Sequence, residues 1–193
     1  VAGGTSSGKT TLTNALLAEV AKTSDRIVLI EDTRELQCKA PNLVALRTKD
    51  GVVSLSDLVR SSLRLRPDRI PIGEVRGAEI LAMIDAGLGS TGSLSTTHAR
   101  DAEGAIDKLI TCGMKDGAHI TEQYMKKALA ACVDVIVFLN LDTHGRGAYG
   151  PGKRDRYVTQ ILELGKVVGD DITTSDIYVR GEHGHAIPFT MSD

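Results

Sequence analysis

The sequence predicts an α/β fold in which a mostly parallel sheet is flanked by helices and followed by an antiparallel hairpin near the C-terminus. Apolar segments such as residues 27–30 and 133–139 are typical of strands that are buried on both faces of a sheet. These segments alternate with stretches of helical periodicity, as expected where helices cross over between parallel strands. The composition fits one globular domain, because 41% of the 193 residues are apolar and 25% are charged.

The first expected element is a helix over residues 9–22, because its apolar residues recur on one face: Leu12, Leu16, Leu17 and Val20. Residues 26–31 contain four consecutive apolar residues and are expected to form a buried strand. Residues 44–48 are expected to form a shorter strand.

The middle of the chain continues the alternation. Ser56 is expected to cap a helix that runs to Arg66, and Pro67 would end it because proline disfavours a helical conformation in the residue before it. Residues 69–73 form the next expected strand. The remaining elements are expected in this order: a helix over 77–86, a hydroxyl-rich strand over 93–97, a helix capped by Asp101 through Thr111, a helix capped by Thr121 through Ala131, and a strand over 133–139.

The pattern changes near residue 140. Residues 142–155 are rich in glycine and charge and are expected to form an exposed loop. Residues 157–168 and 172–179 are expected to form two strands of an antiparallel hairpin around residues 169–171, and residues 181–193 a loose tail. We therefore expect a core over residues 1–140, with 141–193 belonging to the same domain. Most of the strand that should precede Gly3, and any domain before it, are expected to lie outside the chain.

The composition argues against several classes of function. The formal net charge is −2, so no overall basic field would attract nucleic acid or anionic lipid. Aromatic residues make up 3% with no Trp, which argues against base-stacking platforms, so no sequence-specific nucleic-acid binding is expected. No run of about 18 apolar residues is present to span a membrane. Three widely spaced cysteines indicate free thiols rather than a zinc site.

A glycine-rich motif opens the chain. Residues 3–10 match the pattern G-x-x-x-x-G-K-[ST], in which glycines let backbone N–H groups curl around a phosphate chain. Lys9 would neutralise the β- and γ-phosphates, and the hydroxyl of Thr10 would hold Mg²⁺. We therefore predict that ATP with Mg²⁺ binds to one continuous segment: Gly3, Gly4, Thr5, Ser6, Ser7, Gly8, Lys9, Thr10 and Thr11.

Three further strand ends are expected at the same edge of the sheet. Glu74 follows an apolar strand and is predicted to face the γ-phosphate, because ligands bind beyond the carboxyl ends of such strands. A metal-supporting Asp would usually occupy the position of Gly73, so Glu74 is expected to serve both the metal and, through water, the nucleophile. The alternative is a solvated charge paired with Arg76.

Glu31, favoured over Asp32, is predicted to polarise water or support the metal, and the alternative is a cap for the following segment. His98 follows the hydroxyl-rich strand and is predicted to sense the γ-phosphate, the alternative being a structural histidine. Arg64 and Arg76 are candidates to contact phosphoryl oxygens, since a planar guanidinium binds them bidentately and a neighbouring subunit can deliver one. A salt-bridged surface is the alternative for each arginine.

Taken together, these segments resemble the type II/IV secretion-system ATPase family, which includes conjugation and Tad pilus-assembly members. Four motifs carry the resemblance: Walker A at 3–10, the Asp box at 30–36, an atypical Walker B at 63–77 and the His box at 92–99. The resemblance covers residues 1 to about 140. Residues 30–76 look most like conjugation members, whereas the hairpin looks more like Tad members.

The resemblance implies a RecA-like P-loop NTPase core and a homo-oligomer, in the form of a hexameric ring. It further implies inner-membrane secretion or pilus components as partners, on the cytoplasmic side of that membrane. By analogy with the family, Glu74 is the catalytic carboxylate, Glu31 assists it and His98 contacts the γ-phosphate. Arg64 matches the arginine before Walker B. Hydrolysis would change the angle between this core and an N-terminal domain.

Two other functions remain open on the sequence alone, a small-molecule P-loop kinase and a scaffold that binds ATP without hydrolysing it. Two minor signals are weaker. His183 and His185 beside Glu182 suggest a metal site, with a tail as the alternative. A basic loop could touch DNA or a membrane, with a solvated loop as the alternative: Arg146, Lys153, Arg154 and Arg156.

Overall fold

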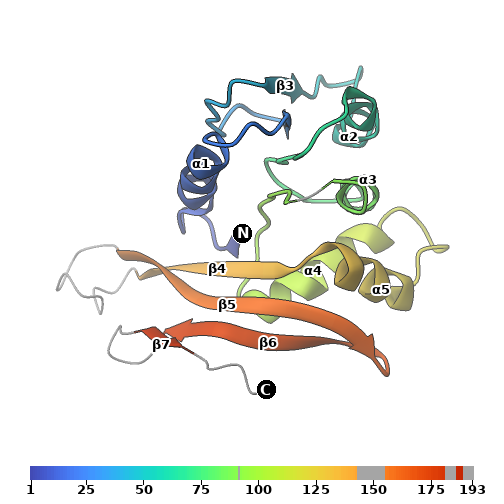
Figure 1. Cartoon of the computed structure of the whole chain (residues 1–193). Coiled ribbons are helices and arrows are strands. Elements are labelled where there is room, and N and C mark those ends of the chain that lie inside the picture. The colour runs from blue at the N-terminus through green and yellow to red at the C-terminus, as the bar shows by residue number, and fades with distance from the viewer. Residues whose placement is uncertain (91, 143–154, 181–185, 189–193) are drawn as a thin grey trace.

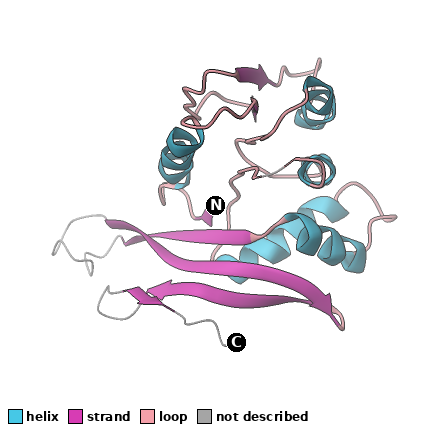
Figure 2. Cartoon of the chain, in the orientation of Figure 1, coloured by secondary structure: helices cyan, strands magenta, loops and turns pink. Residues whose placement is uncertain are grey.

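The computed structural model describes residues 1–90, 92–142, 155–180 and 186–188, in which helices cover a long twisted sheet (Figures 1 and 2). The elements in chain order are β1 (Ala2–Gly3), α1 (Lys9–Val20), β2 (Ile27–Glu31), β3 (Leu43–Arg47), α2 (Leu55–Ser62), the 3₁₀ helix η1 (Leu63–Leu65), α3 (Glu79–Gly87), α4 (Ala102–Met114), α5 (Glu122–Cys132), β4 (Val135–Asp142), β5 (Asp155–Val168), β6 (Asp171–Arg180) and β7 (Ala186–Pro188).

One half of the fold is parallel. Strands β2 and β3 pair in parallel over their full lengths. Two extended segments, residues 69–72 and 95–97, continue this arrangement through isolated parallel bridges, and the second of them bridges to β1. Strand β1 in turn pairs in parallel with β4. The spatial order is therefore β3, β2, 69–72, 95–97, β1, β4, with the C-terminal ends of these segments at one edge.

Pro71 explains why the predicted strand over 69–73 is only an extended segment with isolated bridges. The N–H of Val28 donates to the carbonyl of Arg69, and the N–H of Ile30 donates to that of Pro71. A parallel ladder would place an N–H of residue 71 between these two bonds, and proline has none. The missing bond interrupts the ladder without moving the segment away from β2.

The other half of the fold is antiparallel. Strand β4 pairs with β5, β5 with β6 and β6 with β7. The predicted hairpin is confirmed, and Gly169 at its turn has the positive φ of +65° that tight turns require. The hairpin extends the sheet at β4. The predicted mostly parallel sheet is therefore found only in the half of the fold that carries the strand ends. Strand β7 lies in the region expected to be a loose tail.

Helices cover both faces of the sheet. Strand β2 is buried throughout, and its alternating side chains enter two clusters. Leu29 packs with Leu17 of α1 on one face. Val28 and Ile30 belong to the larger core on the other face, which also contains residues of α2 to α5, β4 and β5. Figure 1 shows α1 separated from the other helices in the same way.

The buried face of α1 differs from the predicted one. Among the residues expected on its apolar face, Leu17 is buried, whereas Leu12, Leu16 and Val20 are partly exposed. The buried positions are Lys9, Thr13 and Leu17, which are four residues apart and therefore share a face. The predicted apolar face is therefore confirmed at Leu17 and only in part at the other three positions.

The predicted caps of α4 and α5 are confirmed, but that of α2 is not. Asp101 and Thr121 each accept a hydrogen bond from the backbone N–H three residues on. Helix α2 is capped by Ser54 rather than Ser56, because Asp57 three residues later completes a capping box with Ser54. The helix ends at Ser62, and Arg66, before Pro67, has a φ of +54°.

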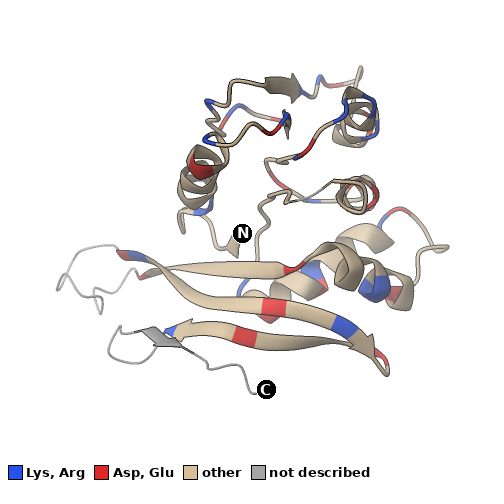
Figure 3. Cartoon of the chain, in the orientation of Figure 1, with Lys and Arg blue, Asp and Glu red and all other residues tan. Residues whose placement is uncertain are grey.

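Charges of both signs are distributed over the described elements, as Figure 3 shows. In the part of the chain that the structure describes, no helix is both long and apolar enough to cross a membrane. Cys38, Cys112 and Cys132 are free thiols.

We expect Ser54→Ala to lower the free energy of unfolding by about 1 kcal/mol, because the N-cap bond and its reciprocal partner are both lost. The measurement is urea unfolding followed by circular dichroism. Ser56→Ala is the matched control, since Ser56 lies inside the helix, and its unfolding midpoint should stay close to that of the wild type. Equal effects of the two substitutions would refute the assignment of the cap.

Candidate active site

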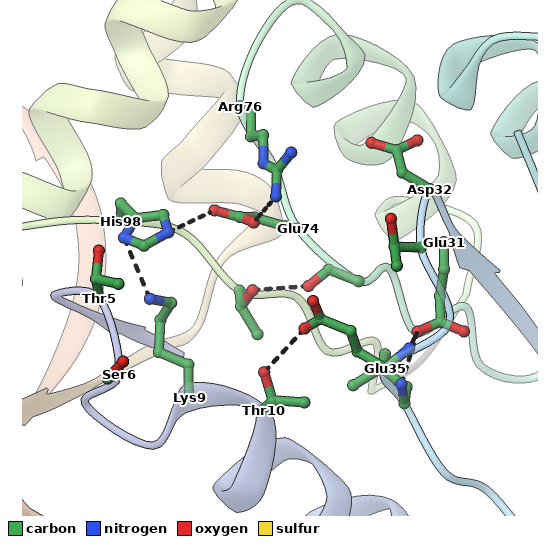
Figure 4. A pocket seen from close by; sticks show the side chains of 14 residues that line it. Thr5, Ser6, Lys9, Thr10, Glu31, Asp32, Glu35, Glu74, Arg76 and His98 are labelled. Atoms are coloured by element: carbon green, nitrogen blue, oxygen red, sulfur yellow. Dashed lines mark hydrogen bonds and ion pairs between the residues drawn. The ribbon is translucent and has the colours of Figure 1, made fainter. Parts of the chain in front are cut away.

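The ends of four parallel segments surround a cavity of about 370 Å³ (Figure 4). The loop after β1 forms one wall, and the segments that follow β2, 69–72 and 95–97 form the others. The cavity is lined by Thr5, Ser6, Lys9, Thr10, Glu31, Asp32, Thr33, Glu35, Leu36, Gly73, Glu74, Arg76, Thr96 and His98. The predicted strand ends Glu31, Glu74 and His98 are therefore brought together beside the glycine-rich loop.

The glycine-rich loop has a backbone that side chains would obstruct. A Cβ on Gly3 would lie 2.5 Å from both the Leu139 carbonyl oxygen and Ser7 Oγ. Gly8 caps α1 with a φ of +100°, a conformation that costs glycine little. Ser6 has a φ of +60°, which is unusual for a residue with a side chain. These turns aim the start of α1, with its unpaired N–H groups, at the cavity.

Lys9 is held beneath the loop. Its ammonium donates hydrogen bonds of 3.0 Å to the carbonyl oxygens of Gly3 and Gly4. The residue is 8% exposed. Burial lowers the pKa of Lys9, and the negative charges of Glu74 and Glu35 partly offset this effect. A bound phosphate would compete with two neutral carbonyls for this cation.

His98 lies between Lys9 and Glu74 and contacts both (Figure 4). Lys9 Nζ is 3.3 Å from His98 Nδ1, and His98 Nε2 is 3.0 Å from Glu74 Oε1. Because an ammonium can only donate, Nδ1 accepts, and the proton of a neutral imidazole is then on Nε2. The predicted proximity of His98 to Lys9 is thus observed, and its phosphate-sensing role stays a prediction.

Glu74 is the centre of the polar network. Its Oε2 accepts a hydrogen bond from Arg76, which raises the pKa of the Arg76 guanidinium. Its Oε1 is buried and accepts no hydrogen bond of good geometry, although His98 Nε2 lies 3.0 Å from it. A buried carboxylate oxygen without an aligned donor is costly and available to accept a hydrogen bond.

Two threonines fix the backbone on each side of Glu74. The hydroxyl of Thr96 donates to the carbonyl of Gly73 at 2.7 Å, and that of Thr97 donates to the carbonyl of Val75 at 3.2 Å. Both threonines are buried. The density of hydroxyls over 93–97 therefore has a structural cause, since the two extended segments share few backbone hydrogen bonds.

Glu31 faces its own following loop. Its Oε1 accepts hydrogen bonds from the backbone N–H groups of Glu35, at 2.9 Å, and Leu36, at 2.7 Å. It is 3% exposed, whereas Asp32 is exposed. This is the geometry of the alternative interpretation, a cap for the next segment. Assistance to hydrolysis by Glu31 stays a prediction.

Glu35 is a site residue that the sequence analysis did not single out. Its Oε2 accepts a hydrogen bond from the hydroxyl of Thr10 at 3.2 Å, at the position predicted to hold Mg²⁺. The available signal was the acidic segment 31–35, which holds three carboxylates. Which of them reaches Thr10 depends on the path of the loop that Glu31 holds.

Other predicted residues lie elsewhere. Arg64 is exposed on η1 and is not among the residues that line the cavity, and Thr11 is exposed on α1 outside it. The predicted basic loop and the His183–His185 pair lie outside the described residues, with the exception of Arg156, which bonds to the glycine-rich loop.

Comparison with known proteins places this geometry in a family. The sequence model of the family described as "Type II/IV secretion system protein" matches residues 1–153. The conjugal transfer protein TrbB of Rhizobium radiobacter is 41% identical over 149 residues, which cover 76% of this chain and 45% of that protein. The type IV secretion system protein VirB11 of Bartonella quintana is 37% identical over 145 residues, covering 71% of this chain and 40% of that protein.

A solved structure agrees in fold. The VirB11 ATPase from the Brucella suis type IV secretion system, solved in complex with sulphate, superposes with a TM-score of 0.73 at 31% identity. The match covers 83% of this chain and 46% of that one. The chain thus spans less than half the length of the curated relatives it matches. Its fold is that of P-loop secretion ATPases, a mixed sheet with helices on both faces.

The contacts of Glu31 predict that Glu31→Ala loosens the segment that carries Glu35. We expect the amides of Glu35 and Leu36 to exchange at least about tenfold faster, because each loses a charge-assisted hydrogen bond, typically about 1.5–3 kcal/mol. The measurement is amide hydrogen exchange of the protein without nucleotide.

Asp32→Ala is the matched control, because Asp32 is the exposed neighbouring acid, and protection of the two amides should persist. If Glu31→Ala instead leaves their exchange unchanged while abolishing ATP turnover, Glu31 acts on water or metal as the sequence first indicated.

Proposed function

Because the chain belongs to the Type II/IV secretion system protein family, we propose that it binds Mg-ATP and hydrolyses it to power a bacterial conjugation or type IV secretion machine. The observation that carries this proposal is Glu74 Oε1, a buried carboxylate oxygen without an aligned donor in the cavity beside Lys9 and Thr10. Nucleotide binding alone does not require a free carboxylate oxygen, whereas hydrolysis requires an acceptor that orients the attacking water.

The described residues fit both the triphosphate and the metal. The start of α1 and Lys9 suit a phosphate chain, and the sulphate of the Brucella suis VirB11 structure is an anion of similar shape and charge. Thr10 and Glu35 offer a hydroxyl and a carboxylate within 3.2 Å of each other, and Mg²⁺ prefers oxygen ligands. Within the described ranges no three His, Cys, Asp or Glu residues form a metal cluster, but Mg²⁺ bound with ATP needs only one or two protein oxygens.

The chain's own residues have distinct roles in the proposed reaction. Glu74 orients a water toward the γ-phosphorus and accepts its hydrogen bond through Oε1. Lys9 and His98 stabilise the charge that develops on the phosphoryl oxygens. Thr10 and Glu35 would hold Mg²⁺, whose charge would offset that of the phosphate.

Arg76 donates a hydrogen bond to Glu74 Oε2 and so fixes the orientation of the carboxylate. Thr96 and Thr97 fix the backbone on each side of it. The orientation of the proposed acceptor therefore depends on groups outside the bond-breaking step.

We further propose that the chain is a RecA-like subunit of a hexameric ring, working with membrane-bound secretion components on the cytoplasmic side. Two observations support a subunit contact at the cavity. Arg64 is exposed, and the side chain of Arg76, which lines the cavity, is 67% exposed. An arginine that does not line its own cavity can complete that of a neighbour. The motion that hydrolysis drives would be transmitted through this contact.

We expect Glu74→Gln to keep Mg-ATP affinity within a few-fold and to lower turnover by at least about a hundredfold, the usual contribution of a general base. Binding is measured by calorimetry and turnover by release of inorganic phosphate into water. Lys9→Ala should lose binding itself, because Lys9 is the cation that the described residues place beneath the loop.

Glu19→Gln is the control, since Glu19 is exposed on α1 and pairs only with Lys22 in the described contacts. Unchanged turnover in Glu74→Gln would leave a nucleotide-binding scaffold, and transfer of the phosphoryl group to a small acceptor would make the protein a kinase.

The proposed ring predicts complementation between two inactive variants. Arg64→Ala and Glu74→Gln should each lose activity alone, and mixed at equal amounts they should restore about a quarter of wild-type turnover, the share of interfaces that pair an intact Glu74 with an intact Arg64. The measurement is phosphate release after exchange of subunits. No recovery, with both variants assembled, would place Arg64 outside the neighbour's site.

A further inference from the structure

Arg156 is the one residue of the predicted basic loop that the structure describes, and its side chain is directed to the glycine-rich loop. Its Nε–H donates a hydrogen bond of 2.7 Å to the carbonyl oxygen of Ser6, 150 residues earlier in the chain. The aliphatic part of the same side chain covers Gly8, because Cδ of Arg156 lies 3.1 Å from the position of a Cβ on Gly8. This contact joins the start of β5 to the phosphate site.

The position of this contact separates Arg156 from the catalytic groups. In a phosphate cradle the backbone N–H groups converge on the anion. Arg156 bonds instead to the carbonyl of Ser6, and it is not among the residues that line the cavity. Arg156 therefore acts on a nucleotide through the loop and does not take part in the reacting set.

The backbone conformation of Ser6 explains how this contact stabilises the loop. Its φ of +60° is a left-handed conformation that a residue with a side chain adopts only at an energetic cost. The carbonyl of that residue is the one that Arg156 holds with a charge-assisted hydrogen bond. The bond stabilises the turn that lets the following N–H groups converge on phosphate.

A β-bulge carries Arg156 to this face of the sheet. Phe138 is opposite Gln160 but Leu139 is opposite Val158, so β5 has one extra residue, Thr159. Gln160 points toward α4, where it bonds to Glu103. Successive side chains alternate between faces, and one extra residue exchanges the faces of all residues beyond it.

Without the bulge, Tyr157 would be opposite Leu141, and Arg156 would point toward α4 with Gln160. With the bulge, Arg156 is opposite Leu141 and shares its face with Leu139. Leu139 is itself paired with Gly3, where the glycine-rich loop leaves the sheet. The bulge thus places one cation across β4 from the loop.

We infer that Arg156 is a positioning residue of the phosphate loop and makes the nucleotide affinity of the site depend on the β4–β5 hairpin. The inference rests on the proposed function, since the affinity in question is that for Mg-ATP and Mg-ADP. A force or partner that moves the start of β5 would therefore change the conformation of the phosphate loop through Arg156.

The test compares Arg156→Ala and Arg156→Lys with the wild-type chain. Arg156→Ala should weaken Mg-ADP and Mg-ATP binding about equally, by about tenfold, because both nucleotides use the same loop, and saturated turnover should stay close to wild type. Arg156→Lys should recover part of the affinity, since an ammonium can donate to Ser6 but packs less well over Gly8. Lys166→Ala removes another exposed cation of β5 and should change nothing.

A second measurement needs no nucleotide. Arg156→Ala should speed hydrogen exchange of the Ser7 and Gly8 amides, and the thermal unfolding midpoint should not change, because Arg156 is exposed. Equal affinities and equal exchange in wild type and Arg156→Ala would overturn the inference, as would a fall in saturated turnover at constant affinity. If the wild-type chain binds no nucleotide, the proposed function fails, and the exchange experiment still tests the contact with the loop.

Discussion

The site depends on the hydrogen bonding of residues 95–97 between β1 and the 69–73 segment. This segment joins the strand that leads into the phosphate loop to the strand that ends at Glu74. Its backbone pairing is sparse, and the hydroxyls of Thr96 and Thr97 add bonds to the carbonyls beside Glu74. If the segment moved, Lys9 and Glu74 would no longer share His98 as a neighbour, so the position of one short segment sets the distance between cation and acid.

A balance of charge governs the cavity itself. Lys9, His98, Glu74 and Arg76 form a chain of contacts in this order, so the Glu74 carboxylate lies between an imidazole and a guanidinium. Every member has a partner in this chain, which limits the cost of placing charge in a partly buried site. The exception is one oxygen of Glu74, and an unsatisfied group at such a position is where chemistry is expected.

The antiparallel hairpin adds a second support to the same loop. Strand β4 presents the Leu139 carbonyl to Gly3, and β5 presents Arg156 to Ser6. The phosphate loop is thus held from one side by the parallel strands and from the other by the hairpin. The single extra residue in β5 is the reason that the second contact exists. Residues of β4 and β5, near the C-terminal end of the described chain, therefore help to hold a loop near its N-terminal end.

The amino-acid sequence was enough to predict the phosphate loop, the alternation of strands and helices, the hairpin, and the three strand ends that carry Glu31, Glu74 and His98. These follow from short-range patterns, glycine spacing and apolar runs, and from the rule that parallel strands place their carboxyl ends at one edge. Tertiary structure decided what each side chain does there. Glu31 turned to its own loop and Glu35 reached Thr10, because loop path sets which of three acids enters the cavity. Arg156 joined the phosphate loop, because a bulge changes the face of a strand and leaves no mark in hydrophobic periodicity.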